Sequence, residues 1–334
     1  MRQQWEKLLG LCALGFALEL VLFKFLPDLS NGLLQRQTSN LTDFAQFEQT
    51  YLTPNSVHHA RFLGNYILYY LAKILGSLYH SADVRLHPLR VAAGILTPVY
   101  AVAGAVPALW GRQPLSWRYF LVLYGAMVVI GQYVFYPADM PSLALLSIAL
   151  YCLLQERLVY ALLLMLGVGL FRETSLHMVW FVALWAICLP VRRRGSRWVW
   201  VGVFALAFVA EYVLVRRLFP GPVSSAGAVI LDPRAIFLDR GMLSLTTICS
   251  LGLAAVFPLI CLLRLGALPG DDWRRRFFQL NCYAVLGWVI FYRMMAGNLA
   301  EFRMLFPVLL PCIYGVAYAA AVRHEPSEPA QSGT

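Results

Sequence analysis

The charged residues that could take part in chemistry are concentrated in short segments between long apolar runs. In the segment FRETS, Arg172 directly precedes Glu173. In AEFRMLFP, Glu301 precedes Arg303 by two residues. A guanidinium presents a planar fork of donors that matches two phosphate oxygens, and a nearby carboxylate can fix its orientation. These pairs predict recognition of a phosphate group. The alternatives are a local ion pair at a membrane interface and, for Glu301, a favourable place in a first helical turn.

Two aspartates are candidates for taking a proton from a substrate hydroxyl. Asp43 lies in the first long polar loop, and Asp139 lies between two prolines in YPADMPS. Each also has a simpler explanation as the N-cap of a helix, which for Asp139 would begin at Pro141. A positioned carboxylate is a common general base. We therefore predict Asp43 as the catalytic base and Asp139 as the second choice, with Glu173 as the third catalytic carboxylate.

His59 and Arg61 stand just before an amphipathic segment and are further candidates for binding a phosphate. The adjacent pair His58 and His59 does not predict a metal site, because neighbouring side chains diverge. The sequence contains no HExxH, no P-loop and no GxSxG, and no GxGxxG lies in a strand–helix setting. A soluble hydrolase or nucleotide-dependent enzyme is therefore disfavoured. No cofactor is predicted, and a divalent metal is compatible with the sequence but not required by it.

The elements that must hold these residues are membrane-spanning helices. Of the 334 residues, 60% are hydrophobic and 13% are charged, whereas about a quarter are charged in a soluble domain. The net charge of +10 comes from arginine clusters such as Arg192–Arg194 at the ends of apolar runs. Cytoplasmic loops carry such clusters, so they predict contact with membrane lipid and not with nucleic acid. The seven cysteines lie in apolar runs without a CxxC pair and are predicted to be small buried hydrophobes.

Ten apolar runs predict an all-α, polytopic transmembrane bundle that forms a single domain over residues 1–322. The predicted spanning helices are roughly Leu8–Leu26, Val91–Trp110, Tyr119–Tyr136, Pro141–Leu154, Leu158–Phe171, Ser175–Val191, Trp198–Phe219, Leu243–Leu263, Phe277–Ala296 and Phe302–Val322. Pro141–Leu154 and Leu158–Phe171 are short for a hydrocarbon core of about 30 Å, so a re-entrant pair is the alternative for them. Residues 323–334 are predicted to be a disordered cytoplasmic tail.

An amphipathic helix is predicted over residues 61–80, within a first outer loop of residues 27–90. Polar side chains such as Asn65 and Lys73 fall on one face, and apolar side chains fill the other. If the arginine-rich links are cytoplasmic, counting the spans places both ends of this helix outside. The helix then lies on the outer face of the membrane and does not cross it. The same count places both chain termini in the cytoplasm and every loop of mixed charge outside.

The order of these motifs resembles the GT-C superfamily of membrane glycosyltransferases, and more narrowly the bacterial integral membrane proteins of that type. The motifs that carry the resemblance are Arg61-Phe62-Leu63 at the start of the amphipathic helix and the turns Asp139–Leu143, Arg172–Ser175 and Glu301–Pro307. The resemblance spans about residues 1–322. The first loop departs from it, because many GT-C enzymes have an adjacent acidic pair or an aromatic–Asp pair there, whereas Asp28, Asp43 and Glu48 are well separated.

The resemblance implies a sugar transfer with inversion at the outer, periplasmic face of a bacterial inner membrane. The donor would be a sugar on a polyprenyl phosphate, and the acceptor a saccharide, a lipid or a protein. Asp43 would take the proton of the acceptor hydroxyl. Arg172 and Arg303, with Arg61 as the third choice, would stabilise the departing phosphate. Glu173 and Glu301 would orient these arginines, and the lipid tail would lie beside the helix of residues 61–80.

Two other classes of function stay open. A transporter or flippase for a lipid-linked saccharide would place its polar groups near the bilayer midplane. Here Glu19, Glu211 and Arg293 lie within the apolar runs, whereas the acid–base pairs cluster in the outer loops. A non-catalytic subunit of a polysaccharide assembly complex would share the architecture without needing a base. An assay of sugar transfer separates the enzyme from both alternatives.

Overall fold

The computed structural model describes residues 2–20, 41–53, 61–78, 80, 86–110, 115–131, 136–190, 194–219, 245–268, 270, 272–294 and 305–324. Every regular element in these ranges is helical, and none is a strand. The elements are α1 (Arg2–Leu20), α4 (Phe44–Phe47), the π-helix η4 (Glu48–Leu52), α5 (Phe62–Leu78), α6 (Pro88–Trp110), α7 (Trp117–Gly131), α8 (Asp139–Leu154), α9 (Leu158–Phe171), the 3-10 turn η7 (Glu173–Ser175), α10 (Leu176–Cys188), α11 (Arg194–Leu218), α14 (Leu245–Gly266), α15 (Trp273–Met294) and α16 (Phe306–His324).

The predicted all-α class is confirmed, and the predicted runs match the helices to within a few residues at most ends. Helix α9 has the predicted bounds. Helix α1 begins at Arg2 and not near Leu8, because its first turn consists of polar helix formers that a hydropathy pattern does not mark. Helix α8 begins at Asp139, two residues before the predicted start at Pro141. The predicted tail beyond His324 lies outside the described residues.

Within the described ranges, three helices are long and apolar enough to cross a bilayer by length and composition. They contain the segments Pro88–Leu109, Ser196–Leu218 and Phe306–Arg323. The other apolar helices that meet the composition limit are shorter, among them Asp139–Leu154 and Leu158–Phe171. The chain is thus an α-helical protein with three candidate spans, which indicates a membrane protein, and the predicted number of about ten spans is not confirmed.

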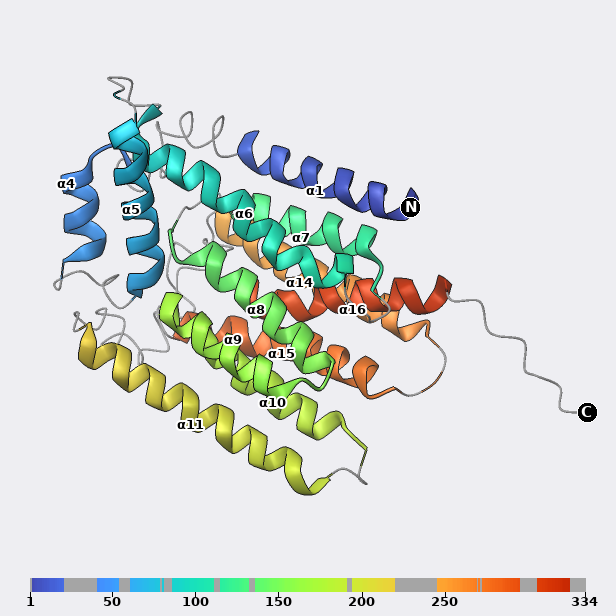
Figure 1. The fold of residues 1–334 in the computed structure, drawn as a ribbon. Helices are drawn as coiled ribbons and strands as arrows, with labels where there is room; N and C mark the ends of the chain where they lie inside the picture. Colours follow the sequence, from blue (N-terminus) through green and yellow to red (C-terminus); the bar gives the residue numbers. More distant parts are fainter. Residues whose placement is uncertain are drawn as a thin grey trace, which may run out of the picture.

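Helix α16 lies at the centre of the bundle, in contact with α7, α8, α14 and α15 (Figure 1). Its residues are buried almost throughout, and its interior is tied to its neighbours by hydrogen bonds. The Tyr314 hydroxyl donates to the Ser147 carbonyl oxygen of α8 over 2.9 Å. The Ser147 hydroxyl donates in turn to the Gly104 carbonyl oxygen of α6 over 2.7 Å. Such bonds are favourable inside a bundle because its apolar interior offers few other partners.

Three cysteines meet where α14, α15 and α16 pack together. The Sγ atoms of Cys282 and Cys312 are 3.7 Å apart, and the Cys261 thiol interacts with that of Cys282. Cys261 fits against α16 because Gly315 has no side chain: a Cβ there would lie 2.5 Å from the Cys261 Sγ atom. All three thiols are free and buried. They fill the helix contact as small buried groups, as predicted, whereas Cys12 is exposed and the prediction is wrong for it.

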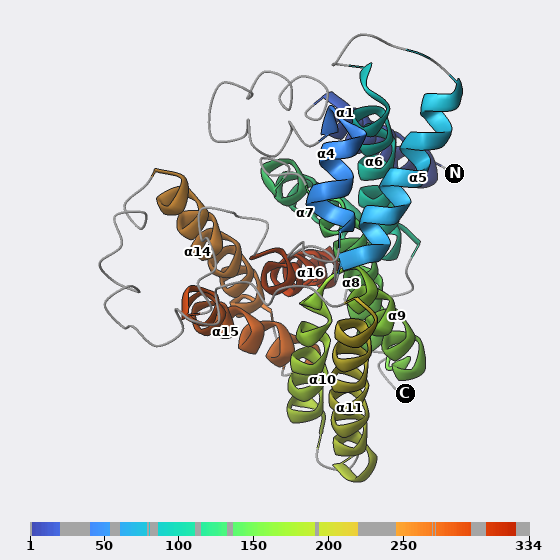
Figure 2. The ribbon, with the colours of Figure 1, turned by 90° about the vertical axis from the view of Figure 1, so that its left-hand side faces the viewer.

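Helices α4 and α5 form a separate layer across one end of the bundle. Figure 1 shows α5 crossing the ends of the long helices, and Figure 2 shows the same layer from its outer side. Helix α1 begins, and α16 ends, at the opposite end of the bundle (Figure 1). On α5, Asn65 is buried and donates to the Tyr51 carbonyl oxygen over 3.2 Å. Tyr70, Ile74 and Leu78 are exposed, as are Lys73 and Ser77, so α5 turns Asn65 toward the protein and leaves both polar and apolar side chains on its outer side.

Candidate functional site

Charged side chains from four parts of the chain meet at the end of the bundle that α5 covers. Arg61 comes from the start of α5, and Asp139 is the first residue of α8. Arg172 and Glu173 lie in the turn between α9 and α10, and Arg216 lies in the last turn of α11. Four of these five residues were predicted as site residues, from three separate motifs. The fold therefore brings Arg61, Asp139, Arg172 and Glu173 to one place.

The centre of this cluster is a buried ion pair between Asp139 and Arg172. The Arg172 Nη1 atom lies 2.5 Å from Asp139 Oδ1, and both side chains are less than a tenth exposed. Helix α9 ends at Phe171 because Arg172 adopts an extended backbone, with φ −164° and ψ 152°. Asp139 does not cap α8, contrary to the simpler explanation, because the N-cap position belongs to Ala138. The Asp139 carboxylate instead holds Arg172 in place.

Glu173 bridges two arginines at the edge of the cluster. Its carboxylate lies 3.5 Å from Arg61 Nε and 3.2 Å from Arg216 Nη2. Asp139 and Arg172 balance each other, so one carboxylate faces two guanidiniums on this side. Counting Arg61, Arg216 and Glu173, the edge of the cluster has one more positive than negative charge, which favours an anionic group. The Glu173 side chain is 37% exposed, so a bound molecule can reach it.

The pKa of Glu173 is lowered from its ordinary value of 4.5. Burial raises the pKa, but Arg61, a backbone N–H and the other two arginines together outweigh that effect. A depressed pKa stabilises the fold above the ordinary value, and this contribution is lost as the pH falls through the lower folded value. Water screens the half-exposed carboxylate, so the contribution is modest.

We expect the difference in unfolding free energy between the wild type and Glu173→Gln to be constant near neutral pH. It should shrink as the pH falls below about 4.5. Equilibrium unfolding in mixed micelles at a series of pH values measures this difference. The contributions of the other carboxylates to the pH dependence cancel, because both proteins contain them. A difference that stays constant down to the most acidic pH at which both proteins fold would contradict the assignment.

Hydroxyl and imidazole groups fix the turn that carries Arg172 and Glu173. The hydroxyls of Ser142 and Thr174 are 2.6 Å apart, which joins the first turn of α8 to η7. His177 Nδ1 lies 3.0 Å from the Thr174 carbonyl oxygen. The imidazole ring packs on Trp288 of α15, with 4.6 Å between the ring centroids. These contacts position the charged pair and do not themselves face the exposed edge of the cluster.

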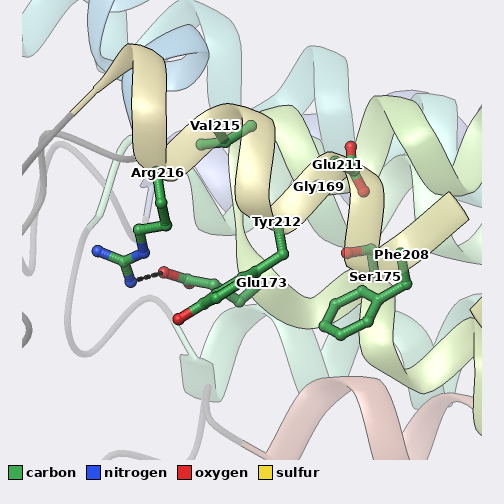
Figure 3. Close-up of a pocket in the computed structure, with 8 residues that line it drawn as sticks. All are labelled: Gly169, Glu173, Ser175, Phe208, Glu211, Tyr212, Val215 and Arg216. Atoms are coloured by element: carbon green, nitrogen blue, oxygen red, sulfur yellow. Dashed lines mark hydrogen bonds and ion pairs between the residues drawn. The ribbon is translucent and has the colours of Figure 1, made fainter. Parts of the chain in front are cut away.

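A small pocket lies beside Glu173, between α9, η7 and α11 (Figure 3). Its lining residues are Gly169, Glu173, Ser175, Phe208, Glu211, Tyr212, Val215 and Arg216. Figure 3 shows Glu173 and Arg216 together on one side of the pocket and Glu211 with Gly169 on the other. About 20 Å³ of the space is open to the centre of a water molecule, which is enough for one or two waters. The pocket itself is too small to hold a sugar ring.

The structure does not bring Asp43 to this cluster. Asp43 is the N-cap of α4, where its Oδ1 atom accepts from the Ala45 N–H over 2.9 Å. Segments α4 and η4 run antiparallel to α5, since Tyr51 contacts Asn65 and Glu48 contacts Lys73. Asp43 therefore lies beyond the Lys73 level, roughly 18 Å along α5 from the cluster at 1.5 Å per residue. The N-cap explanation accounts for what Asp43 does in the structure.

Two residues of the site were missed by the sequence analysis. Arg216 was read as part of an apolar run, and Glu211 was noted only as a carboxylate inside a helix. One feature of the sequence could have identified Arg216. Arg216 and Arg217 place two positive charges at the predicted outer end of a span, whereas the positive-inside rule predicts such charges at the inner end. The predicted site residues His59, Glu301 and Arg303 lie outside the described residues.

Among the residues that the structure describes, no three His, Cys, Asp or Glu side chains come together as metal ligands would. Comparison of the chain with family models, with curated proteins and with solved structures found no match. These comparisons therefore do not bear on the resemblance to the GT-C superfamily.

Proposed function

We propose that the protein is a membrane glycosyltransferase that takes a sugar from a polyprenyl-phosphate donor and passes it to an acceptor hydroxyl. The observation that carries this proposal is the excess positive charge at the exposed edge of the cluster, where Arg61 and Arg216 share the single carboxylate of Glu173. Such an edge suits one phosphate group, because two guanidinium forks can take its oxygens. The donor phosphate would bind there.

In the proposed reaction, the acceptor oxygen attacks the anomeric carbon while the bond from that carbon to the phosphate oxygen breaks. The phosphate leaves with the bonding electrons and is stabilised by Arg61 and Arg216. Glu173 takes the acceptor proton, because it is the half-exposed carboxylate of the cluster and stays ionised at neutral pH. Asp139 and Arg172 are positioning residues that hold the turn. A single displacement inverts the configuration of the sugar.

The proposal includes the placement of the protein in the membrane. Residues 1–322 would form one domain of about ten spanning helices in a bacterial inner membrane, with both termini in the cytoplasm and the cluster at the periplasmic face. Two features support this: the three candidate spans, and the position of α5 across the end opposite the start of α1 and the end of α16. The exposed apolar side chains Tyr70, Ile74 and Leu78 would then lie in lipid.

A transfer assay in reconstituted vesicles tests the proposal, with a panel of radiolabelled polyprenyl-phosphate sugars as donors. Replacing Arg216 or Arg61 by alanine removes a charged contact to the phosphate, so we expect transfer to fall at least about tenfold. Arg118→Ala is the matched control, because its exposed guanidinium pairs with Glu6 away from the cluster. Loss of transfer in all three variants, or no transfer by the wild type across the panel, would contradict the proposal.

A transporter or flippase for a lipid-linked saccharide is the second candidate function. The observation that favours it is Glu211, a buried carboxylate inside the candidate span Ser196–Leu218. Ionisable groups within spans commonly belong to ion or substrate pathways. The same vesicles separate the two functions: a flippase would expose labelled lipid on the other leaflet without forming a glycosylated product.

A further inference from the structure

Glu211 is a buried carboxylate that the proposed transfer reaction does not use. It is 8% exposed, and neither of its carboxylate oxygens has a hydrogen-bond partner of standard geometry among the described residues. The Ser175 hydroxyl lies near enough to donate to the carboxylate outside that standard geometry. A buried carboxylate without a charged partner is costly, so such a group is normally neutralised by a cation or a proton.

The packing around Glu211 is built to admit its carboxylate. A Cβ atom on Gly169 would lie 2.1 Å from Glu211 Cδ, so only glycine leaves room for the acid group at this position. The guanidiniums nearby contact other carboxylates: Arg172 contacts Asp139, and Arg216 contacts Glu173. Figure 3 shows Glu211 turned toward Gly169, on the far side of the pocket from the pair of Glu173 and Arg216. The positive charge that would neutralise Glu211 is therefore not supplied by these arginines.

The groups near Glu211 carry oxygen atoms of the kind that coordinate hard cations. The Ser175 hydroxyl and the Glu173 carboxylate line the same pocket. Helix α9 stops at Phe171: the Arg172 N–H still donates to the Val168 carbonyl oxygen, and the carbonyls that follow lie at the helix end, where intrahelical donors run out. The end of a helix that exposes carbonyls is also the negative end of its dipole. Broken helices in membrane proteins use such ends to coordinate Na⁺.

The size and charge of the pocket select the kind of cation. It has room for one or two water-sized groups, which excludes an organic cation. One positive charge is enough to neutralise the Glu211 carboxylate. A Ca²⁺ ion needs six to eight oxygen ligands, which usually come from several carboxylates, and the pocket is too small for that many. We propose that the pocket formed by Gly169, Ser175 and Glu211 binds a small monovalent cation, Na⁺. This inference does not depend on whether the protein transfers sugars.

The test measures whether Na⁺ stabilises the purified wild-type protein in detergent micelles. The melting temperature is followed by tryptophan fluorescence in sodium, potassium or choline chloride at equal ionic strength. A cation that binds the folded state raises the melting temperature in a concentration-dependent and saturable way. We expect this rise with sodium and not with choline. Equal rises in all three salts would reflect ionic strength alone and would overturn the proposal.

Variants locate the effect. Glu211→Gln keeps the size of the side chain but removes its charge, so we expect the sodium-dependent rise to disappear. Ser175→Ala should shift the half-saturating sodium concentration upward severalfold. Glu19→Gln is the matched control, because it removes an exposed carboxylate from the apolar helix α1 and should leave the rise intact. A rise that persists in Glu211→Gln would place the ion elsewhere and overturn the proposal.

A proton is the competing occupant of the Glu211 carboxylate, and the pH arm of the experiment distinguishes it. Glu173, Tyr212 and Arg216 line the same pocket. The pH dependence of the melting temperature is therefore also measured for Glu173→Gln, to separate titration of Glu173 from titration of Glu211. Because protons and Na⁺ compete for one carboxylate, we expect more sodium to be needed for half-saturation at lower pH. A melting temperature that depends on pH through Glu211 but not on sodium would mean that the site holds only a proton, which overturns the proposal.

Discussion

Replacing Arg172 with methionine is expected to lower the unfolding free energy by about 3–5 kcal/mol, because it leaves the buried Asp139 carboxylate without its guanidinium. The pair lies at 2.5 Å with both side chains almost fully buried, so water cannot take over the role of the lost arginine. Equilibrium unfolding in mixed micelles, compared with the wild type, measures the loss. The same cost is expected for Asp139→Leu, which leaves the guanidinium buried.

The double variant Asp139→Leu/Arg172→Met separates stability from function. It removes both charges, so most of the stability lost in either single variant should return. Sugar transfer should not return, because the turn that holds Glu173 between its two arginines loses its anchor; we expect a fall of about 100-fold. A double variant that transfers sugar at the wild-type rate would show that the ion pair has no role at the site. If the double variant lost as much unfolding free energy as the sum of the two single variants, the result would contradict a direct interaction between Asp139 and Arg172.

Replacing Gly64 with alanine is expected to destabilise the protein by about 3 kcal/mol, near the upper end of the usual cost of overpacking. A Cβ atom at Gly64 would lie 2.8 Å from Ala138 Cα and 2.9 Å from the Pro137 carbonyl oxygen. Both are backbone atoms of the turn that leads into Asp139, so no side chain can rotate away to make room. Helix α5 must move outward, and Arg61, one turn before Gly64, must leave Glu173.

Gly202→Ala provides the control for this prediction. Gly202 is also helical, but nothing lies within 4 Å of the Cβ that the substitution would add. Alanine there should be neutral or should stabilise by up to about 1 kcal/mol, because it favours the helix over the unfolded chain. Thermal melts of the two variants measure the contrast, with sugar transfer as a second readout. A Gly64→Ala protein as stable as Gly202→Ala would show that α5 does not pack closely on the turn.

The helices could be predicted from the sequence because each one is a continuous apolar run bounded by charged or proline-containing links. The run Leu158–Phe171, for example, lies between Arg157 and Arg172 and has the same bounds in the structure. The first residues of the helices were less predictable. Helix α8 begins at Asp139, whose carboxylate contacts Arg172, and a partner 33 residues away leaves no trace in the local pattern.

The cluster could be predicted only in part, for a related reason. Arg61, Asp139, Arg172 and Glu173 were identified because each interrupts the apolar pattern near a turn. Glu211 lies inside an apolar helix, and its environment depends on Gly169 of another helix. Asp43 shows the converse: a carboxylate in the expected loop can be a helix cap far from the cluster. The packing of the helices determines which charged residues meet. This packing cannot be predicted from the local pattern of a single sequence.

The central position of α16 has a consequence for biosynthesis. Its candidate span is 83% buried, whereas that of α11 is 17% buried. Chains are made from the N-terminus at about 5–20 residues per second, so the helices that surround α16 emerge from the ribosome before it does. Until Tyr314 arrives, the Ser147 carbonyl oxygen of α8 lacks the donor that the Tyr314 hydroxyl provides in the finished fold. A chain truncated before Phe306 would therefore keep the walls of the bundle but lack its centre, so the fold closes only after α16 has been made.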